Sequence, residues 1–268
     1  MVRPHTSYRI LAALVLLAVL GVVFVSLGNW QLRRAAERTA IRESIEAGRA
    51  SAPLDLRGDT PDGALRPWRP ATAQGTWRHD LTVLLENRNH EGRPGYWVAT
   101  PLLMDDGVAV LVLRGWLPRF TGASGAPAAP QVPSLPGEQH VTGELLERVP
   151  RLFELAAWAG GGDSTLPGHL PQADGAPPII QNLDLADYAA ATGLKLVPAV
   201  LAQTVAPRPP KPDAALQPGA SMVYDWPEPS IDADQNRGYA LQWFGFATIA
   251  ALAWIVIAWR ALRRPRKP

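Results

Sequence analysis

The sequence has no cysteine and little charge. The absence of cysteine from all 268 residues excludes disulfides, thiolate catalysis and cysteine-ligated metals. Charged residues make up 19% of the chain, below the usual quarter, whereas 47% of the residues are apolar. The formal charge of +2 gives no overall field that would attract nucleic acid. Part of the chain is therefore expected to lie away from water.

Signatures of enzymes are also missing. The chain has no G-x-S-x-G, no phosphate-binding P-loop and no G-x-G-x-x-G. Its five histidines never pair at the i, i+3 or i+4 spacing typical of metal sites. His79 and His90 are the two that a hairpin could bring together. We therefore expect a protein that is not an enzyme, with no metal site.

What the chain does contain is two long apolar runs. Residues 10–27 carry no charge, and residues 241–259 form a second run of similar length. About 20 apolar residues suffice to cross the hydrocarbon core of a bilayer. Trp30, Trp243 and Trp259 lie at the ends of these runs, where aromatic rings favour the membrane interface. No small-residue cleavage site closes the first run, so both runs are predicted to be retained spans rather than a signal peptide.

The positive charges near the ends of the spans predict the orientation. Residues 260–268 hold five Lys and Arg and no acid, which marks a cytoplasmic tail. With two spans the tail 1–9 lies on the same side, and residues 28–240 form an extracytoplasmic, periplasmic domain. Arg33 and Arg34 then lie on the side that a simple charge rule disfavours, which suggests lipid phosphates or acidic protein groups as their partners. A bacterial inner membrane is preferred to a mitochondrial inner membrane, since no long amphipathic presequence precedes the first span.

The external domain reads as mainly β, in an α+β arrangement. Residues 31–47 are predicted to continue the first span as a solvated helix. Two apolar runs around Asp106-Gly107 predict a hairpin whose strands are buried on both faces, as in a small barrel or a sandwich. A helix is expected after Asp184, and a strand pair near 194–204 with Pro198 at its edge. About seven strands are expected in all, with Pro/Gly-rich loops at 120–137, 159–178 and 207–229.

Arg114 is unusual because it interrupts the apolar run LVLRGWLP. An unpaired buried charge is costly. Arg114 is therefore predicted to pair with a carboxylate, to lie at a solvent-exposed edge, or to face an anionic group such as a propionate or a lipid phosphate.

Four blocks of sequence resemble one family. They are LGNWQLRR, GYWVATPLLMDDGVAVLVLRGWLP, QNLDLADYAAATG and GYALQWFGFA, and they occur in the order and spacing of the surfeit-locus family of cytochrome c oxidase biogenesis factors. The resemblance covers essentially the whole chain. It implies a membrane-anchored chaperone that assists haem a insertion or the maturation of oxidase subunit I, with transient contact to haem a. The implied partners are subunit I, the haem a synthesis machinery and the lipid bilayer, without nucleic acid.

The resemblance also suggests which residues interact with partners. Some family members bind haem a through a histidine three residues before the tyrosine of the last block, where this chain has Asn236. Asn has no basic nitrogen and is a poor axial ligand for haem. The interaction candidates from the four blocks are Trp30, Gln31, Arg33, Arg34, Thr100, Pro101, Arg114, Gly115, Trp116, Asn182, Tyr239, Trp243 and Phe244.

Two other functions are compatible with the residues. The first is a haem-carrying membrane protein that uses an external ligand such as His79 or His90. The second is a two-span sensor or structural protein of the cell envelope with no link to an oxidase.

Overall fold

The computed structural model describes residues 4–119, 130, 132–153, 165–206 and 222–263. The chain divides into two compact units. One joins residues 1–43 to residues 228–268, and the other consists of residues 44–227. Much of the three loops predicted at 120–137, 159–178 and 207–229 falls outside the described residues, as do both extreme ends of the chain.

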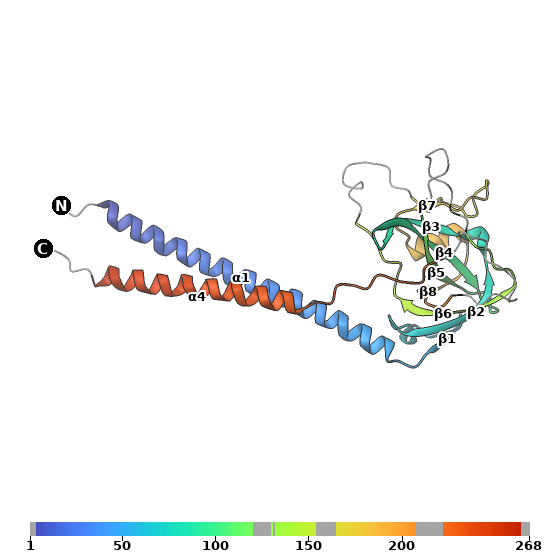
Figure 1. Cartoon of the computed structure of the whole chain (residues 1–268), viewed down its shortest axis with the longest axis horizontal. Helices are drawn as coiled ribbons and strands as arrows, with labels where there is room; N and C mark the ends of the chain where they lie inside the picture. The colour runs from blue at the N-terminus through green and yellow to red at the C-terminus, as the bar shows by residue number, and fades with distance from the viewer. Residues whose placement is uncertain (1–3, 120–129, 131, 154–164, 207–221, 264–268) are drawn as a thin grey trace. The chain divides into compact units, whose positions relative to one another are not determined.

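The first unit is built on two long helices, α1 (Pro4–Arg49) and α4 (Asp234–Leu262). They run antiparallel, because Phe24 meets Trp243 whereas Arg38, further along α1, meets Asp232, which precedes α4 (Figure 1). At 1.5 Å per residue both helices exceed the roughly 30 Å of a hydrocarbon core. The predicted span 10–27 and the predicted helix 31–47 are one uninterrupted helix, so the expected continuation is confirmed.

The apolar side chains of these helices are exposed rather than buried. None of the most apolar 18-residue window of α1 is buried, and only 11% of that of α4. A core helix of a soluble protein would be mostly buried. Exposed residues such as Leu11, Val15, Leu241 and Ile249 instead present apolar surface outward. This surface favours anchoring in a membrane, while the boundaries of the two spans stay predictions.

The second unit contains a closed five-stranded β-barrel. The sheet order is β1-β2-β6-β8-β5-β4-β3-β7, and an additional pairing of β2 with β4 closes the central five strands. The strands are β1 (Leu54–Leu56), β2 (Pro70–Trp77), β3 (Val83–His90), β4 (Arg93–Leu103), β5 (Ala109–Pro118), β6 (Glu138–Leu146), β7 (Ile179–Ile180) and β8 (Leu196–Gln203). Short 3-10 turns lie at Asp62–Ala64 (η1) and His79–Leu81 (η2). Of the two predicted architectures, the barrel is confirmed.

The hairpin β4–β5 forms as its sequence predicts. Gly107 adopts φ +78°, a conformation open to glycine, and its N–H donates to the carbonyl of Met104 at 3.0 Å. Both faces of the hairpin are buried for different reasons. Val110 and Val112 face the barrel interior, where residues from all five barrel strands meet. The intervening Leu111 packs in a second core with helix α3.

Helix α3 (Leu185–Thr192) begins at the predicted cap. The Asp184 carboxylate accepts a hydrogen bond from the N–H of Ala186, and Gly193 ends the helix at φ +69°. The prediction for Pro198 is wrong. Residues 196–203 form the single strand β8, which lies between β5 and β6 rather than at an edge. A register shift in its pairing with β5 between Ala109 and Leu111 accommodates the missing N–H of the proline.

Candidate functional site

The first and last of the four sequence blocks meet where Gly28 of α1 packs against Phe244 of α4. Nδ2 of Asn236 donates to Oε1 of Gln31 at 2.6 Å. A Cβ placed on Gly28 would lie 2.7 Å from the ring of Phe244, so glycine is required for this close approach. The two helices are thus joined by an amide pair and by direct packing at one level.

Aromatic rings extend this contact toward the N-terminal end of α1. Phe24 stacks on Trp243 with ring centroids 5.8 Å apart, and Phe246 lies 5.7 Å from Phe24. Among the predicted interaction residues, Trp243 and Phe244 therefore contribute to helix pairing.

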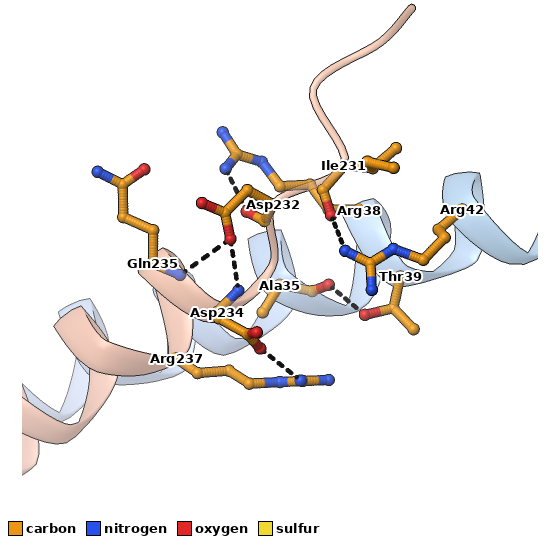
Figure 2. A network of polar contacts seen from close by, with 9 residues as sticks. All are labelled: Ala35, Arg38, Thr39, Arg42, Ile231, Asp232, Asp234, Gln235 and Arg237. Carbon is orange, nitrogen blue, oxygen red and sulfur yellow. Dashed lines mark hydrogen bonds and ion pairs between the residues drawn. The ribbon is translucent and has the colours of Figure 1, made fainter.

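Beyond the amide pair, two arginines of α1 hold the chain that enters α4. Arg38 donates to the carbonyl of Asp232 at 2.6 Å and Arg42 to that of Ile231 at 2.9 Å, as Figure 2 shows. The Asp232 carboxylate in turn accepts from the N–H of Asp234, at the first turn of α4 (Figure 2). This arginine clamp, formed by Arg38 and Arg42, fixes the start of α4 on α1. The clamp could not be predicted from the sequence, because the carbonyls that accept these hydrogen bonds are part of every backbone.

Other candidates of the helix unit stay exposed. Trp30 is exposed on α1, with the Arg34 guanidinium 5.9 Å from its ring centroid. Arg34 also lies 3.8 Å from Glu37, a contact that is weak because both side chains are in solvent. Arg33 and Tyr239 are exposed as well. These residues are available for contacts outside the unit.

Arg114 is buried at the barrel interior, since it continues the face of Val110 and Val112 on β5. Its guanidinium lies 4.7 Å from the ring centroid of Trp77 and donates to the carbonyl of Pro133 at 2.8 Å. Burial lowers the pKa of Arg114 to about 10. No carboxylate lies within ion-pair distance among the described residues. Burial contradicts the predicted exposed edge, and among the described residues an aromatic face and a carbonyl stand where a carboxylate was predicted.

His79 lies beside Arg114. Its Nδ1 is 3.5 Å from the Arg114 guanidinium and its Nε2 is 3.2 Å from the carbonyl of Leu135. Burial lowers the pKa of His79; the carbonyl of Leu135 opposes this shift, and the charge of Arg114 adds to it.

A second arginine, Arg88 on β3, repeats the arrangement of Arg114. Its guanidinium lies 4.3 Å from the ring centroid of Trp97, one Nη donates to the carbonyl of Gln181 at 2.9 Å, and burial lowers its pKa to about 10. Its Nε has no hydrogen-bond partner within the part of the chain that the structure describes. Trp116 secures the strand by donating from Nε1 to the carbonyl of Arg88 at 2.7 Å. From the sequence alone Arg88 reads as a residue flanking a polar loop, because it lies at the polar end of LTVLLENRN, and its burial could not be predicted.

His90 lies in a different setting from His79. It pairs with Asp225 at 3.2 Å and packs 5.2 Å from the ring of Trp116. In the part of the chain that the structure describes, His79 and His90 have different neighbours and make no contact with each other.

The remaining predicted residues support the barrel itself. Thr100 is fully buried and shares a hydrogen bond of 3.0 Å with Thr82, and the carbonyl of Pro101 accepts from the N–H of Arg78. The side chain of Asn182 accepts a hydrogen bond from the N–H of Leu152 and donates one to the carbonyl of Leu152. Thr100, Pro101 and Asn182 therefore have structural roles within the external domain.

Comparison with known proteins identifies the family of this chain. The model of the SURF1 family matches residues 18–248, which include most of both long helices and the whole barrel. The chain belongs to the SURF1 family. Relatives include the Cytochrome oxidase assembly protein SHY1 of Saccharomyces cerevisiae, 29% identical over 59% of this chain and 41% of the yeast protein. An uncharacterized SURF1-like protein of Mycobacterium tuberculosis is 26% identical over 95% of this chain and 85% of its own length.

At the position where the family resemblance implies a haem ligand, this chain has Asn236. Its amide nitrogen already donates to Gln31, and its buried Oδ1 has no partner among the described residues. An amide that lacks a basic nitrogen and is held by a neighbouring helix does not fit an axial haem ligand. This position serves helix pairing in the present chain.

Proposed function

We propose that this chain is a membrane-anchored assembly factor for cytochrome c oxidase that assists the maturation of subunit I, at the stage where haem a is inserted. The observation that carries the proposal is the family match over residues 18–248, together with the printed name of the yeast relative. The alignment spans less than half of that yeast protein, so the activity, partners and haem specificity of this chain are proposals.

The architecture supports a scaffold rather than a catalyst. Its unusual side chains are two buried arginines on tryptophan faces, Arg88 and Arg114, and each donates to a backbone carbonyl of another segment. Such fully enclosed groups rigidify a domain. Together with the outward apolar surface of α1 and α4, this gives a rigid external domain on a membrane hairpin.

The membrane unit is the proposed contact for subunit I. Its helices present apolar residues outward along their length, and Trp30 and Tyr239 are exposed near the outer ends of the two predicted spans. In the proposed orientation both tails face the cytoplasm of a bacterium and the barrel lies in the periplasm. The haem a synthesis machinery would meet the complex within the same membrane.

The proposal is tested by deleting the gene and restoring it in trans. Haem a per subunit I and oxidase activity are expected to fall in the deletion strain and to recover with the wild-type chain. Succinate dehydrogenase, a respiratory enzyme without haem a, serves as the control and is expected to stay constant. Unchanged haem a content and oxidase activity in the deletion strain would show that the chain has no role in oxidase assembly.

A further inference from the structure

The paired helices enclose an apolar cleft at the level of the predicted spans. Its volume is about 490 Å³, within the size range of small-molecule sites. Small residues open it, Ala18 and Gly21 on α1 with Ala247 and Ala251 on α4. A Cβ built on Gly21 meets no atom within 4 Å, so this wall faces free space. The cleft is wide enough for an apolar chain of a ligand.

A cationic side chain lies above this cleft on the same face of α1. Ser26 lines the cleft, and Arg33 follows seven residues later, close to two full turns. Arg33 is exposed and has no hydrogen-bond or ion-pair partner among the residues that the structure describes. The next residue, Arg34, has a long contact to Glu37 and lies over the Trp30 ring, and its side chain is exposed. Two cationic groups are therefore available over one end of an apolar cleft.

The height of Arg33 matches the phosphate layer of a bilayer. It lies six residues beyond Leu27, the predicted end of the span, which corresponds to about 9 Å along the helix. Headgroups occupy roughly 5–8 Å on each side of the hydrocarbon core. Side chains of a helix tilt toward its N-terminus, which for α1 is toward the membrane, so the guanidinium reaches back into this layer.

The two arginines further along α1 have a different role. Arg38 and Arg42 lie about 16 and 22 Å beyond Leu27, outside the headgroup layer, and both are bound to carbonyls of the clamp. The four arginines thus fall into two pairs along α1. Arg33 and Arg34, nearest the membrane, can bind an external anion, whereas Arg38 and Arg42 are hydrogen-bonded within the protein.

We infer that one anionic phospholipid binds this unit, with an acyl chain in the α1–α4 cleft and its phosphate on Arg33, assisted by Arg34. Guanidinium groups bind phosphate oxygens through paired hydrogen bonds, and basic residues at a membrane surface favour anionic over zwitterionic lipids. This inference rests on the membrane anchoring in the proposed function, not on the oxidase role.

The test measures lipid retained by the purified full-length chain. Protein in mild detergent is equilibrated with equal amounts of dioleoylphosphatidylglycerol and dioleoylphosphatidylcholine, and bound lipid is counted by native mass spectrometry. About one phosphatidylglycerol per wild-type chain is expected. Arg33→Gln is expected to lower the preference for phosphatidylglycerol about fivefold, the effect of one basic residue at the surface. Gly21→Leu, which fills the cleft, is expected to lower retention of both lipids.

Matched controls separate binding from damage to the fold. Arg33→Lys changes the same side chain but keeps a positive charge at the headgroup layer. Gly245→Leu adds the same side chain to α4, where a Cβ also meets no atom within 4 Å but does not line the cleft. Both controls are expected to retain lipid as the wild type does, with helicity by circular dichroism checked for all four variants.

Equal retention of phosphatidylglycerol in Arg33→Gln and Arg33→Lys, or unchanged retention in Gly21→Leu, would overturn the inference. Loss of subunit I co-purification in Arg33→Gln with normal lipid retention would assign the arginine to a protein acid and also contradict it. If gene deletion leaves the oxidase intact while lipid retention follows the pattern above, the proposed function fails and the lipid site stands.

Discussion

Replacing Arg114 by methionine is expected to leave the barrel nearly as stable as the wild type, although the position is buried. At about 1.4 kcal/mol per pKa unit, the lowering of the Arg114 pKa to about 10 puts the burial penalty on the order of 3 kcal/mol. Its hydrogen bond to the Pro133 carbonyl offsets about 1.5–3 kcal/mol, and its position over Trp77 about 2 kcal/mol. Because these terms nearly cancel, Arg114→Met should change the free energy of unfolding by less than about 2 kcal/mol.

Arg114→Ala should behave differently, because it also removes the aliphatic stem from a packed interior. A truncation of this kind costs about 2–5 kcal/mol in buried positions. Urea unfolding of the detergent-solubilised full chain, followed by near-ultraviolet circular dichroism, compares the two variants. If methionine proves as damaging as alanine, the charge itself is needed for folding and the near-cancellation is wrong.

Arg88 provides the internal comparison. Arg88 has the same lowered pKa and a similar tryptophan contact, but its Nε finds no hydrogen-bond partner in the described segments. A buried donor without a partner costs about 1–3 kcal/mol. Arg88→Met should therefore be more favourable than Arg114→Met by about that amount in the same assay, and an equal or smaller effect would contradict the reasoning.

Three further predictions follow from individual contacts. Asn236→Ala removes the bond to Gln31 and should weaken helix pairing by about 0.6–2 kcal/mol in SDS-induced unfolding; no change would show that the amide pair is dispensable. Gly115→Ala should destabilise the barrel by about 1–3 kcal/mol in urea, because Gly115 has φ +144° and a Cβ would lie 2.8 Å from Met222; wild-type stability would refute this strain. The pKa of His79 is lowered in the folded state, so the unfolded chain takes up its proton first, near pH 6.5, and stability falls as pH drops below that value. His79→Gln should flatten this part of the pH profile, and an unaltered profile would exclude His79 as a contributor.

Local elements could be predicted because their signals lie close together in the sequence. Asp106-Gly107 between two apolar runs encodes the β4–β5 hairpin, and Asp184 with Gly193 encodes the limits of α3. The apolar run 10–27 and the helix formers that follow it encode one continuous helix. In each case the deciding contacts span few residues.

Long-range contacts could not be predicted in this way. Barrel closure depends on Trp77 pairing with Leu102, and Arg114 finds Trp77 only because the barrel closes. Proline is typical of edge strands, yet a register shift in the pairing of β8 with β5 allows Pro198 to lie in the middle of the sheet. The arginine clamp joins residues almost 200 positions apart through backbone carbonyls, which any sequence could supply.

The most direct test of the central claim is the isolation of the affinity-tagged full-length chain from growing cells, with quantification of newly made subunit I by pulse labelling. The account predicts that radiolabelled subunit I co-purifies shortly after synthesis and then leaves the complex as haem a-containing oxidase accumulates. The absence of labelled subunit I at every time, with the tagged chain complementing the deletion strain, would contradict a direct role in the maturation of this subunit.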